Sequence, residues 1–243
     1  MYNKKITMLY PGSKNRVRNE LTAIMMQHHR MDKPFVDLFC GGCNLIAHIP
    51  QTVDRYANDN NKYVIALFKS LLKGWRPPNL ITEELYNKIK KNPDSYPPQL
   101  VAFAATTCSY AGFWFGTYAR NIQNYNYALV GCNTLARQIN TMQGIKFSSA
   151  DYREFKIAKG STVYLDPPYE DTREAYLTRN FDSKAFWQYA AALRETTYIS
   201  SFKAPAGFIE VFRRKLVTVN NRQTDKLFVN EYTWDKIYKP MMH

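Results

Sequence analysis

Short apolar runs alternate with helical patterns along most of this chain, and this alternation restricts its fold more than any other feature. Apolar runs bounded by turn residues predict strands, and an amphipathic pattern closed by Gly74 predicts a helix over 61–74. Strands that alternate with helices form a mostly parallel sheet, so we expect an α/β fold. The strands are predicted at 34–39, 53–58, 145–151, 162–166 and 196–202, and further helices at 45–49 and 183–195. Ser183 is the candidate N-cap of the last helix.

The C-terminal part predicts a different kind of pairing. KLVTVN (215–220) and KLFVNEYTW (226–234) are separated by the polar residues NRQTD. Two strand-like runs around a short polar segment are typical of a β-hairpin. We therefore expect a hairpin with its turn at 221–225, which adds an antiparallel edge to the sheet.

Residues of about 75–140 interrupt the alternation. The proline pairs in WRPPNL and SYPPQL divide this segment, and 109–128 is rich in aromatic residues. Aromatic residues dominate cores, although some of these can also stack on a base. We expect residues 1–74 and 141–243 to form one α/β domain and residues 75–140 to form a small, mainly helical insert that reads a substrate.

The charge balance favours a polyanionic partner. The chain has 33 Lys and Arg against 20 Asp and Glu, a net charge of +13. Nucleic acid is the most common partner of such a protein, although a basic protein can also simply be soluble. We find no signal peptide and no apolar stretch long enough to span a bilayer, so the four cysteines are expected to be reduced thiols in a cytoplasm.

Acids end the first two predicted strands. Asp37 is followed by Gly41 and Gly42, and a glycine turn after a strand allows a nucleotide-like cofactor to approach the backbone. A tight turn alone accounts for the glycine pair equally well, since GxGxxG is absent. Asp59 ends the second strand, where an acid binds ribose hydroxyls or caps the next helix.

The sequence Asp166-Pro167-Pro168-Tyr169 follows the strand predicted at 162–166. Each proline biases the residue before it to an extended conformation and lacks an N–H. The Asp166 carboxylate and the Pro167 carbonyl are then two acceptors on a stiff loop, beside the flat ring of Tyr169. Such a site suits a planar substrate with an amino group. Two acceptors would also orient the nitrogen lone pair toward an electrophile such as a sulfonium methyl group.

These motifs resemble those of the DNA adenine methylase (Dam-like, D12 class) family of S-adenosylmethionine-dependent N6-adenine methyltransferases. The resembling segments are LYPGSKNRV (9–17), VDLFCGGCN (36–44), ANDNNKYVIALFKSL (57–71), FSSADYREF (147–155), DPPY (166–169), NFDSKAFW (180–187) and ISSFKAP (199–205). Cys43 departs from the family pattern, because it stands where the second glycine of the family's loop is usual.

The resemblance implies a Rossmann-like methyltransferase sheet, with residues 75–140 as the target-recognition insert. It implies that S-adenosylmethionine is the cofactor and that Asp166, Pro167, Pro168 and Tyr169 are the catalytic residues. The implied cofactor-binding residues are Tyr10, Lys14, Asp37, Phe39, Gly41, Gly42, Asp59, Asp151, Tyr152 and Asp166. We expect no metal site, because Cys40 and Cys43 lack further ligands at short spacing and are better explained as packed thiols.

The implied activity is site-specific N6-methylation of an adenine flipped out of double-stranded DNA, as in restriction–modification systems. We expect a monomer or weak dimer in the cytoplasm of a bacterial or phage-infected cell. Lys91, Tyr118, Arg120 and Arg137 are candidate DNA contacts, and Tyr110, Phe113 and Trp114 are alternatives to core residues as walls of the base pocket. Two alternatives stay open: a non-catalytic DNA-binding relative, and a methyltransferase acting on RNA adenine or on cytosine N4.

Overall fold

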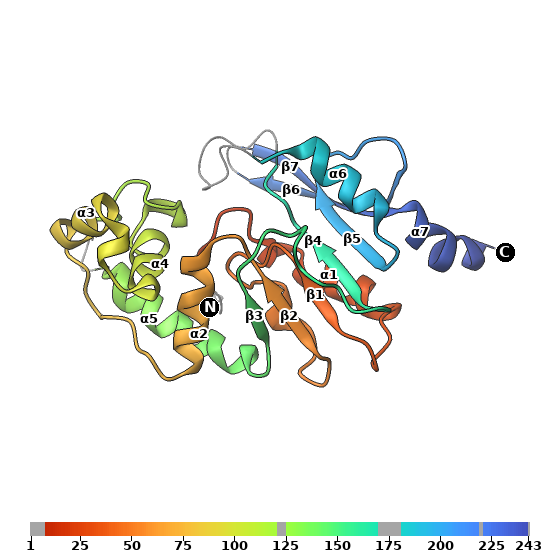
Figure 1. The fold of residues 1–243 in the computed structure, drawn as a ribbon. Helices are drawn as coiled ribbons and strands as arrows, with labels where there is room; N and C mark the ends of the chain where they lie inside the picture. The colour runs from red at the N-terminus through yellow and green to blue at the C-terminus, as the bar shows by residue number, and fades with distance from the viewer. Residues whose placement is uncertain (1–7, 121–124, 170–180, 219–220, 243) are drawn as a thin grey trace.

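A mixed sheet forms the centre of the computed structural model, which describes residues 8–120, 125–169, 181–218 and 221–242 (Figure 1). Within these residues the strand order is β3-β2-β1-β4-β5-β7-β6. The strands are β1 Phe35–Asp37, β2 Arg55–Asn58, β3 Lys146–Ser148, β4 Thr162–Leu165, β5 Thr196–Ser201, β6 Phe208–Thr218 and β7 Asn221–Asn230. The first five pair in parallel, and β7 pairs antiparallel with both β5 and β6. The expected Rossmann-like, mostly parallel α/β fold is confirmed.

The topology creates a switch point between β1 and β4. The chain runs outward from β1 through β2 to β3 and then returns to β4 on the other side of β1. Asp37 at the end of β1 lies opposite Tyr164 of β4. Ligands of open α/β sheets bind outside the carboxyl ends of the strands at such a point.

Helices cover both faces of the sheet. They are α1 Arg18–Gln27, α2 Lys62–Leu72, α3 Glu83–Lys91, α4 Pro98–Thr107, α5 Tyr127–Gln138, α6 Ser183–Ala192 and α7 Glu231–Thr233. Short 3-10 turns are η1 Lys14–Arg16, η2 Ile46–His48, η3 Pro93–Ser95, η4 Tyr110–Gly112, η5 Ile139–Met142 and η7 Lys239–Met242, and η6 Trp234–Tyr238 is a π turn. Figure 1 shows α3, α4 and α5 gathered beside α2, toward the β3 edge of the sheet. None of the helices in the described residues is long and apolar enough to cross a membrane.

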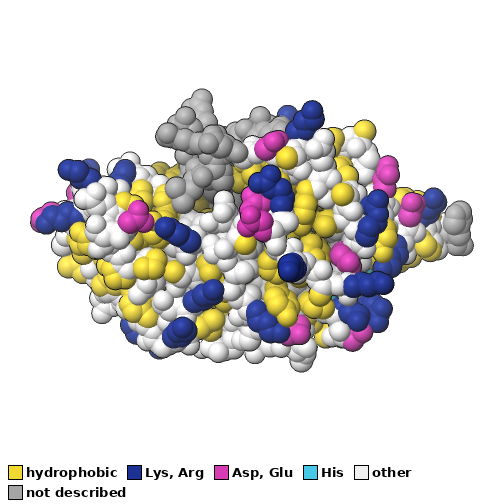
Figure 2. Space-filling view, viewed as in Figure 1, with side chains coloured by type: hydrophobic (Ala, Val, Ile, Leu, Met, Phe, Trp, Pro, Cys, Tyr) yellow, Lys and Arg dark blue, Asp and Glu magenta, His cyan; other side chains and the backbone are white. Residues whose placement is uncertain are grey.

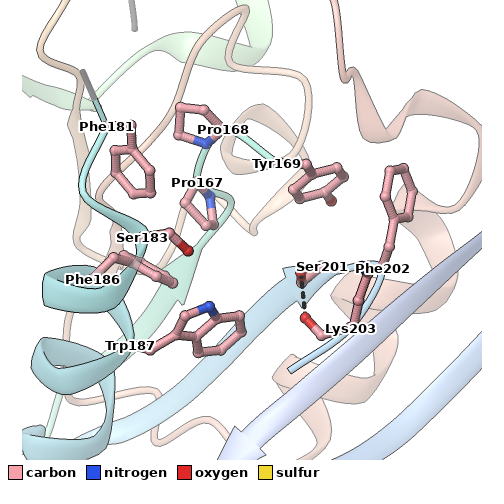
Figure 3. Close-up of a pocket in the computed structure, with 10 residues that line it drawn as sticks. All are labelled: Pro167, Pro168, Tyr169, Phe181, Ser183, Phe186, Trp187, Ser201, Phe202 and Lys203. Atoms are coloured by element: carbon pink, nitrogen blue, oxygen red, sulfur yellow. Dashed lines mark hydrogen bonds between the residues drawn. The ribbon is translucent and has the colours of Figure 1, made fainter. Parts of the chain in front are cut away.

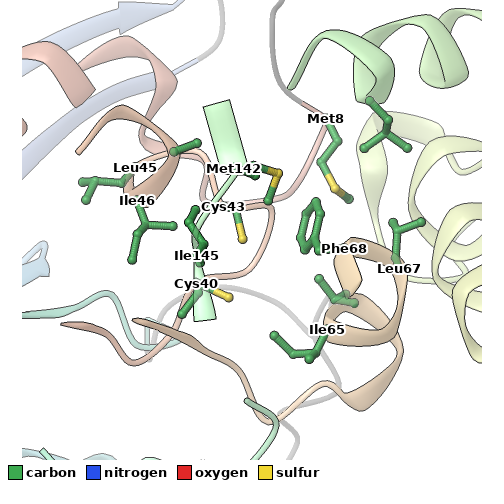
Figure 4. Close-up of a cluster of buried hydrophobic side chains, with 14 of the residues drawn as sticks. Met8, Cys40, Cys43, Leu45, Ile46, Ile65, Leu67, Phe68, Met142 and Ile145 are labelled. Atoms are coloured by element: carbon green, nitrogen blue, oxygen red, sulfur yellow. The ribbon is translucent and has the colours of Figure 1, made fainter. Parts of the chain in front are cut away.

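Two apolar clusters divide the core between the two faces. Alternate residues of a strand point to opposite faces, so Phe35 belongs to one cluster and Val36 to the other. The Phe35 cluster contains Phe68 of α2 and continues to Phe103 of α4, so residues 75–140 share a core with the sheet domain. Figure 4 shows part of this cluster, including the two cysteines of the glycine turn. The proposed domain boundaries stay a prediction.

The predicted C-terminal hairpin is confirmed, but the predicted position of its turn is wrong. Thr218 lies opposite Asn221, and residues 219–220 between them lie outside the described residues. The polar residues 221–225 belong to β7. The hydrogen bonds between two strands join backbone groups, so polar side chains can occupy a strand of this hairpin. Residues 231–233, expected in a strand, form α7 instead, where the Asn230 side chain accepts a hydrogen bond from the backbone N of Thr233.

The N-cap of α6 is also one residue earlier than predicted. Asp182 has an extended backbone, and its carboxylate accepts a hydrogen bond from the backbone N of Ala185 at 2.9 Å. Ser183 is the first helical residue. Asn180 of the segment 180–187 and residues 121–124 of the aromatic segment 109–128 lie outside the described residues.

Candidate active site

Two acids meet at the switch point. Asp37 ends β1, and Asp166 directly follows β4, the parallel neighbour of β1. Burial raises the pKa of Asp37 well above its ordinary value, and the charge of Asp166 raises that pKa further. The pairing of β1 with β4 therefore brings the two carboxylates close enough to interact, which the sequence analysis did not anticipate.

Lys14 and Tyr169 both bind the carboxylate of Asp166. The Lys14 ammonium lies 2.8 Å from Asp166 Oδ1, and the Tyr169 hydroxyl donates to the same oxygen at 3.0 Å. Lys14 Nζ also lies 4.9 Å from the centroid of the Tyr169 ring and donates to the carbonyl of Gly12. Burial raises the pKa of Asp166, and the neighbouring Lys14 charge and the two donated hydrogen bonds oppose this rise. Lys14, expected beside the cofactor, is thus placed directly against the predicted catalytic acid.

The glycine turn is held by Asp59 and covered by Tyr10. The backbone N of Gly41 donates to Asp59 Oδ2, and the backbone N of Asn61 donates to Asp59 Oδ1, both at 2.8 Å. A Cβ atom on Gly41 would lie 2.7 Å from the Tyr10 ring, and one on Gly42 would lie 2.8 Å from Tyr10 Cβ. The glycines are therefore required for the close approach of Tyr10. Asn61, which caps α2, performs the capping role that was the alternative for Asp59.

Cys43 has the backbone conformation of a glycine. Its φ is +54°, in the left-handed region that side chains rarely adopt. This conformation explains why the family usually has glycine there. Cys40 and Cys43 are both buried, and burial raises the pKa of both thiols.

Asp151 and Tyr152 lie on the loop after β3, which is tied to β2. The Asn58 side-chain oxygen accepts from the backbone N of Ala150, and the Asn58 amide donates to the Ala150 carbonyl. The Tyr152 ring packs 5.2 Å from the ring of Phe39, so these two predicted residues are brought together. The Asp151 carboxylate accepts two hydrogen bonds from the Arg153 guanidinium, which lower the pKa of Asp151.

A pocket opens beside the Asp166–Tyr169 loop (Figure 3). Its lining residues are Pro167, Pro168, Tyr169, Phe181, Ser183, Phe186, Trp187, Ser201, Phe202 and Lys203. The Phe202 ring lies 4.4 Å from that of Tyr169, centroid to centroid, and packs edge to face.

The pocket walls differ from those suggested by the sequence. Its lining does not include Tyr110, Phe113 or Trp114, and Tyr110 is 70% exposed. Sequence reasoning missed Trp187 and Phe202 as site residues. The available signal was that both lie in segments resembling the family, but only the folded chain shows which side chains of those segments face the pocket.

The four candidate DNA contacts are dispersed over the insert. Arg120 pairs with Glu83, the first residue of α3, whereas Lys91 is the last residue of that helix. Arg137 belongs to α5, where it donates to the Thr134 hydroxyl.

Tyr118 makes contacts inside the insert. Its hydroxyl donates to the carbonyl of Ile81 at 2.7 Å, and its ring packs against that of Tyr86. The structure therefore gathers the catalytic and most of the cofactor candidates at the switch point, but it does not bring the DNA candidates into one cluster.

A known family model matches part of the chain. The model for D12 class N6 adenine-specific DNA methyltransferases matches residues 10–107. The family resemblance is confirmed over this range. It contains Tyr10, Lys14, the glycine turn and Asp59, and it ends before Asp166. The D12 match supports methyltransferase activity with S-adenosylmethionine as the cofactor. No curated protein matches the chain by sequence.

Two solved structures match the chain at low similarity. The rRNA methyltransferase aviRa from Streptomyces viridochromogenes is 15% identical, with a TM-score of 0.43 over 92% of this chain and 87% of that chain. The protein SMU.472, complexed with SAH, is 15% identical, with a TM-score of 0.34 over 93% of this chain and 57% of that chain.

Proposed function

We propose that this protein is a site-specific DNA adenine N6-methyltransferase that acts on an adenine flipped out of duplex DNA. The observation that carries the proposal is the Asp166–Tyr169 loop at the end of β4, adjacent to the acid at the end of β1, in a chain with a D12 match. A base inside a duplex cannot present its amino group to such a loop, so it must leave the stack.

The residues of the glycine turn fit S-adenosylmethionine by the hydrogen-bonding groups that they offer. Asp37 is a buried carboxylate and Asp59 a half-buried one at the ends of adjacent strands, and such acids accept hydrogen bonds from ribose hydroxyls or an ammonium group. Asn44 beside the turn is 5% exposed, and its Oδ1 has no hydrogen-bond partner among the described residues. When bound, this cofactor supplies an electrophilic methyl group.

The remaining contacts proposed for the cofactor come from side chains around the same turn. Tyr10 covers the glycines, Phe39 packs with Tyr152, and Lys14 and Asp166 border the switch point. Asp151 lies on the loop after β3, and this loop is tied to the end of β2. Asp59 directly follows β2, the neighbour of β3 in the sheet. We place the cofactor across these groups.

Asp166 and the Pro167 carbonyl accept the two hydrogens of the adenine amino group in this proposal. Asp166 Oδ1 is already bound by Lys14 and Tyr169, whereas Oδ2 accepts no hydrogen bond from the described residues and can receive an N6 hydrogen. Acceptors on both hydrogens direct the nitrogen lone pair toward the methyl group. Formation of the N–C bond would break the bond between the methyl group and sulfur, so that the cofactor would leave as a neutral thioether and the positive charge would pass to the nitrogen, which then loses a proton to Asp166 or water. Tyr169 offers its ring face to the base.

The insert, residues 75–140, is proposed to recognise the target sequence. Lys91, Arg120 and Arg137 project basic groups from three parts of it, and Tyr118 supports its interior. The net charge of +13 suits a polyanionic duplex.

Methyl transfer from labelled S-adenosylmethionine tests the proposal directly. Unmodified DNA, RNA and buffer are incubated with the protein, and the products are digested and identified by nucleoside mass spectrometry. Asp166→Ala is compared with Asp235→Ala, a matched change at an exposed acid paired with Lys239. We expect N6-methyladenine in DNA with the wild type and Asp235→Ala, and none with Asp166→Ala.

Other products would replace the proposal. Methylated adenine found only in RNA would identify RNA as the substrate. Methylation at N4 of cytosine would identify cytosine as the target base. Cofactor binding without any methylated nucleoside would point to a non-catalytic DNA-binding role.

A further inference from the structure

The pocket beside Tyr169 has two polar atoms that the proposed mechanism does not use. Its walls are mostly apolar and aromatic, which is typical of a site for a small planar ligand held by a few polar groups. Figure 3 shows the Ser183 hydroxyl pointing toward the middle of the pocket. The indole nitrogen of Trp187 lies on the ring edge that faces the same space.

Both groups have hydrogen atoms to donate. An indole N–H is a donor only, and a half-buried one usually finds a partner. Neither Ser183 nor Trp187 makes a side-chain hydrogen bond within the described part of the chain. A ligand in the pocket would satisfy both.

The fold holds these two donors together. Ser183 and Trp187 are separated by one helical turn on α6, so they lie on the same face of the helix. Asp182 fixes the first turn through its hydrogen bond to Ala185. Phe186 between them is buried in the core, and the Trp187 ring packs 4.8 Å from that of Phe208, centroid to centroid. The donors are therefore positioned before any ligand enters.

We propose that Ser183 and Trp187 are specificity-determining residues that donate hydrogen bonds to ring nitrogens of the substrate base. The proposal rests on the proposed function and assigns the edge of the base that it left undefined. Asp166 and Pro167 are acceptors for an amino group, and the α6 side of the pocket supplies donors. Adenine matches this arrangement, because its amino group is a donor and its adjacent ring nitrogens are acceptors. Guanine presents an acceptor oxygen instead of the amino group, so it would leave Asp166 facing another acceptor.

Two conservative variants remove one donor each. Trp187→Phe keeps an aromatic ring and loses the N–H, and Ser183→Ala loses the hydroxyl. We expect each change to lower kcat/KM for DNA about tenfold, mainly through KM, because a neutral hydrogen bond to a buried acceptor is lost. Ser183→Thr should restore most of the loss. Trp234→Phe makes the same substitution outside the pocket, in η6, and should leave kcat/KM unchanged.

Two further measurements separate recognition from structural support. The Kd for S-adenosylmethionine should be unchanged in both variants, since neither donor is placed at the glycine turn. The Tm should be unchanged in Ser183→Ala and should fall no more in Trp187→Phe than in Trp234→Phe, since both tryptophan rings pack against the core. DNA synthesised with 7-deazaadenine lacks one acceptor nitrogen. If that nitrogen accepts a hydrogen bond from Ser183 or Trp187, the wild type has a lower kcat/KM for this DNA than for normal DNA. The variant that lacks the corresponding donor then shows a smaller difference between the two DNAs.

Each outcome bears on the proposal. Wild-type kcat/KM in both Trp187→Phe and Ser183→Ala would overturn it, and so would a loss of Tm or cofactor affinity that parallels the loss of activity. A wild type that transfers no methyl group to adenine would defeat the proposed function and this inference together, and that result is seen before any variant is made.

Discussion

Asp166 is the residue in which burial and charge compete most directly. Its side chain is 18% exposed, and that of Lys14 is 5% exposed. Burial disfavours the carboxylate, whereas an adjacent ammonium favours it. For the proposed reaction the carboxylate must accept an N–H, so Lys14 is expected to keep it ionised.

Replacing Lys14 should therefore change the pH dependence of methyl transfer. Lys14 lowers the pKa of Asp166, so Lys14→Met raises that pKa. The rate is lost as the pH falls through this pKa, and we expect the acidic limb of the pH–rate profile to move to higher pH. Profiles of kcat for the wild type, Lys14→Met and the exposed control Lys239→Met measure this. An acidic limb that stays in place in Lys14→Met would show that Asp166 is not the titrating group.

Gly41 should tolerate alanine less well than another glycine with positive φ. Gly41→Ala combines a φ of +46° with a contact of 2.7 Å to the Tyr10 ring, whereas Gly74→Ala has a φ of +92° and no neighbour within 4 Å. Backbone strain alone costs about 1 kcal/mol in both, and the displaced ring adds to the cost only at Gly41. Urea unfolding compares the free energies, and equal losses would contradict the contact. Cofactor affinity should fall only in Gly41→Ala.

Helix α6 contributes both to the stability of the protein and to the proposed recognition of the base. Its N-cap, the donors Ser183 and Trp187 and the core residue Phe186 all lie within its first two turns. The Asp182 cap stabilises the start of the helix, and the start of the helix positions the donors. Stability and recognition can be tested separately because Asp182 provides the cap, whereas Ser183 and Trp187 provide the donors.

Asp182→Ala should destabilise the protein, whereas Ser183→Ala should not. The Asp182 carboxylate satisfies a backbone N–H that otherwise has no partner, and loss of such a cap costs about 1 kcal/mol. Ser183 makes no equivalent bond. Thermal and urea unfolding of the two variants measure the difference. The reverse order of stabilities would mean that Ser183, as the sequence alone suggested, is the effective cap.

The whole molecule carries its positive charge over a broad surface. Figure 2 shows Lys and Arg side chains distributed over the visible face, with fewer Asp and Glu among them. Several are paired with acids, including Arg120 with Glu83 and Lys146 with Asp54. A distributed charge of +13 attracts a duplex through its phosphates whatever the base sequence.

DNA binding should consequently be strongly salt-dependent. If six phosphates are contacted, the affinity for duplex DNA falls about 10³-fold between about 50 and 200 mM salt. Fluorescence anisotropy at several salt concentrations gives the slope of log Kd against log salt. The affinity for S-adenosylmethionine should change little over the same range. A flat slope for DNA would contradict a phosphate-dominated interface.

Local patterns were enough to predict most of the strands along the chain. Apolar runs placed β1, β2, β4 and β5, and acids were predicted at the ends of β1 and β2, but the switch point between β1 and β4 follows only from the strand order of the sheet. The Asp166–Tyr169 motif was readable because two consecutive prolines restrict the backbone without help from distant residues. The hairpin turn was misplaced because backbone pairing, rather than side-chain polarity, decides where an edge strand ends.

The sequence by itself therefore determined the α/β class, the glycine turn and the carboxylate with its adjacent carbonyl, since each depends on a few consecutive residues. Only the tertiary structure decided that Lys14 binds Asp166, that Tyr10 covers Gly41 and that Trp187 faces the pocket. Lys14 and Asp166 are far apart in the chain and meet only after β4 pairs with β1 and the N-terminal segment packs across the strand ends. Contacts of this kind depend on how buried surfaces fit together, which the periodicity of a single chain does not encode.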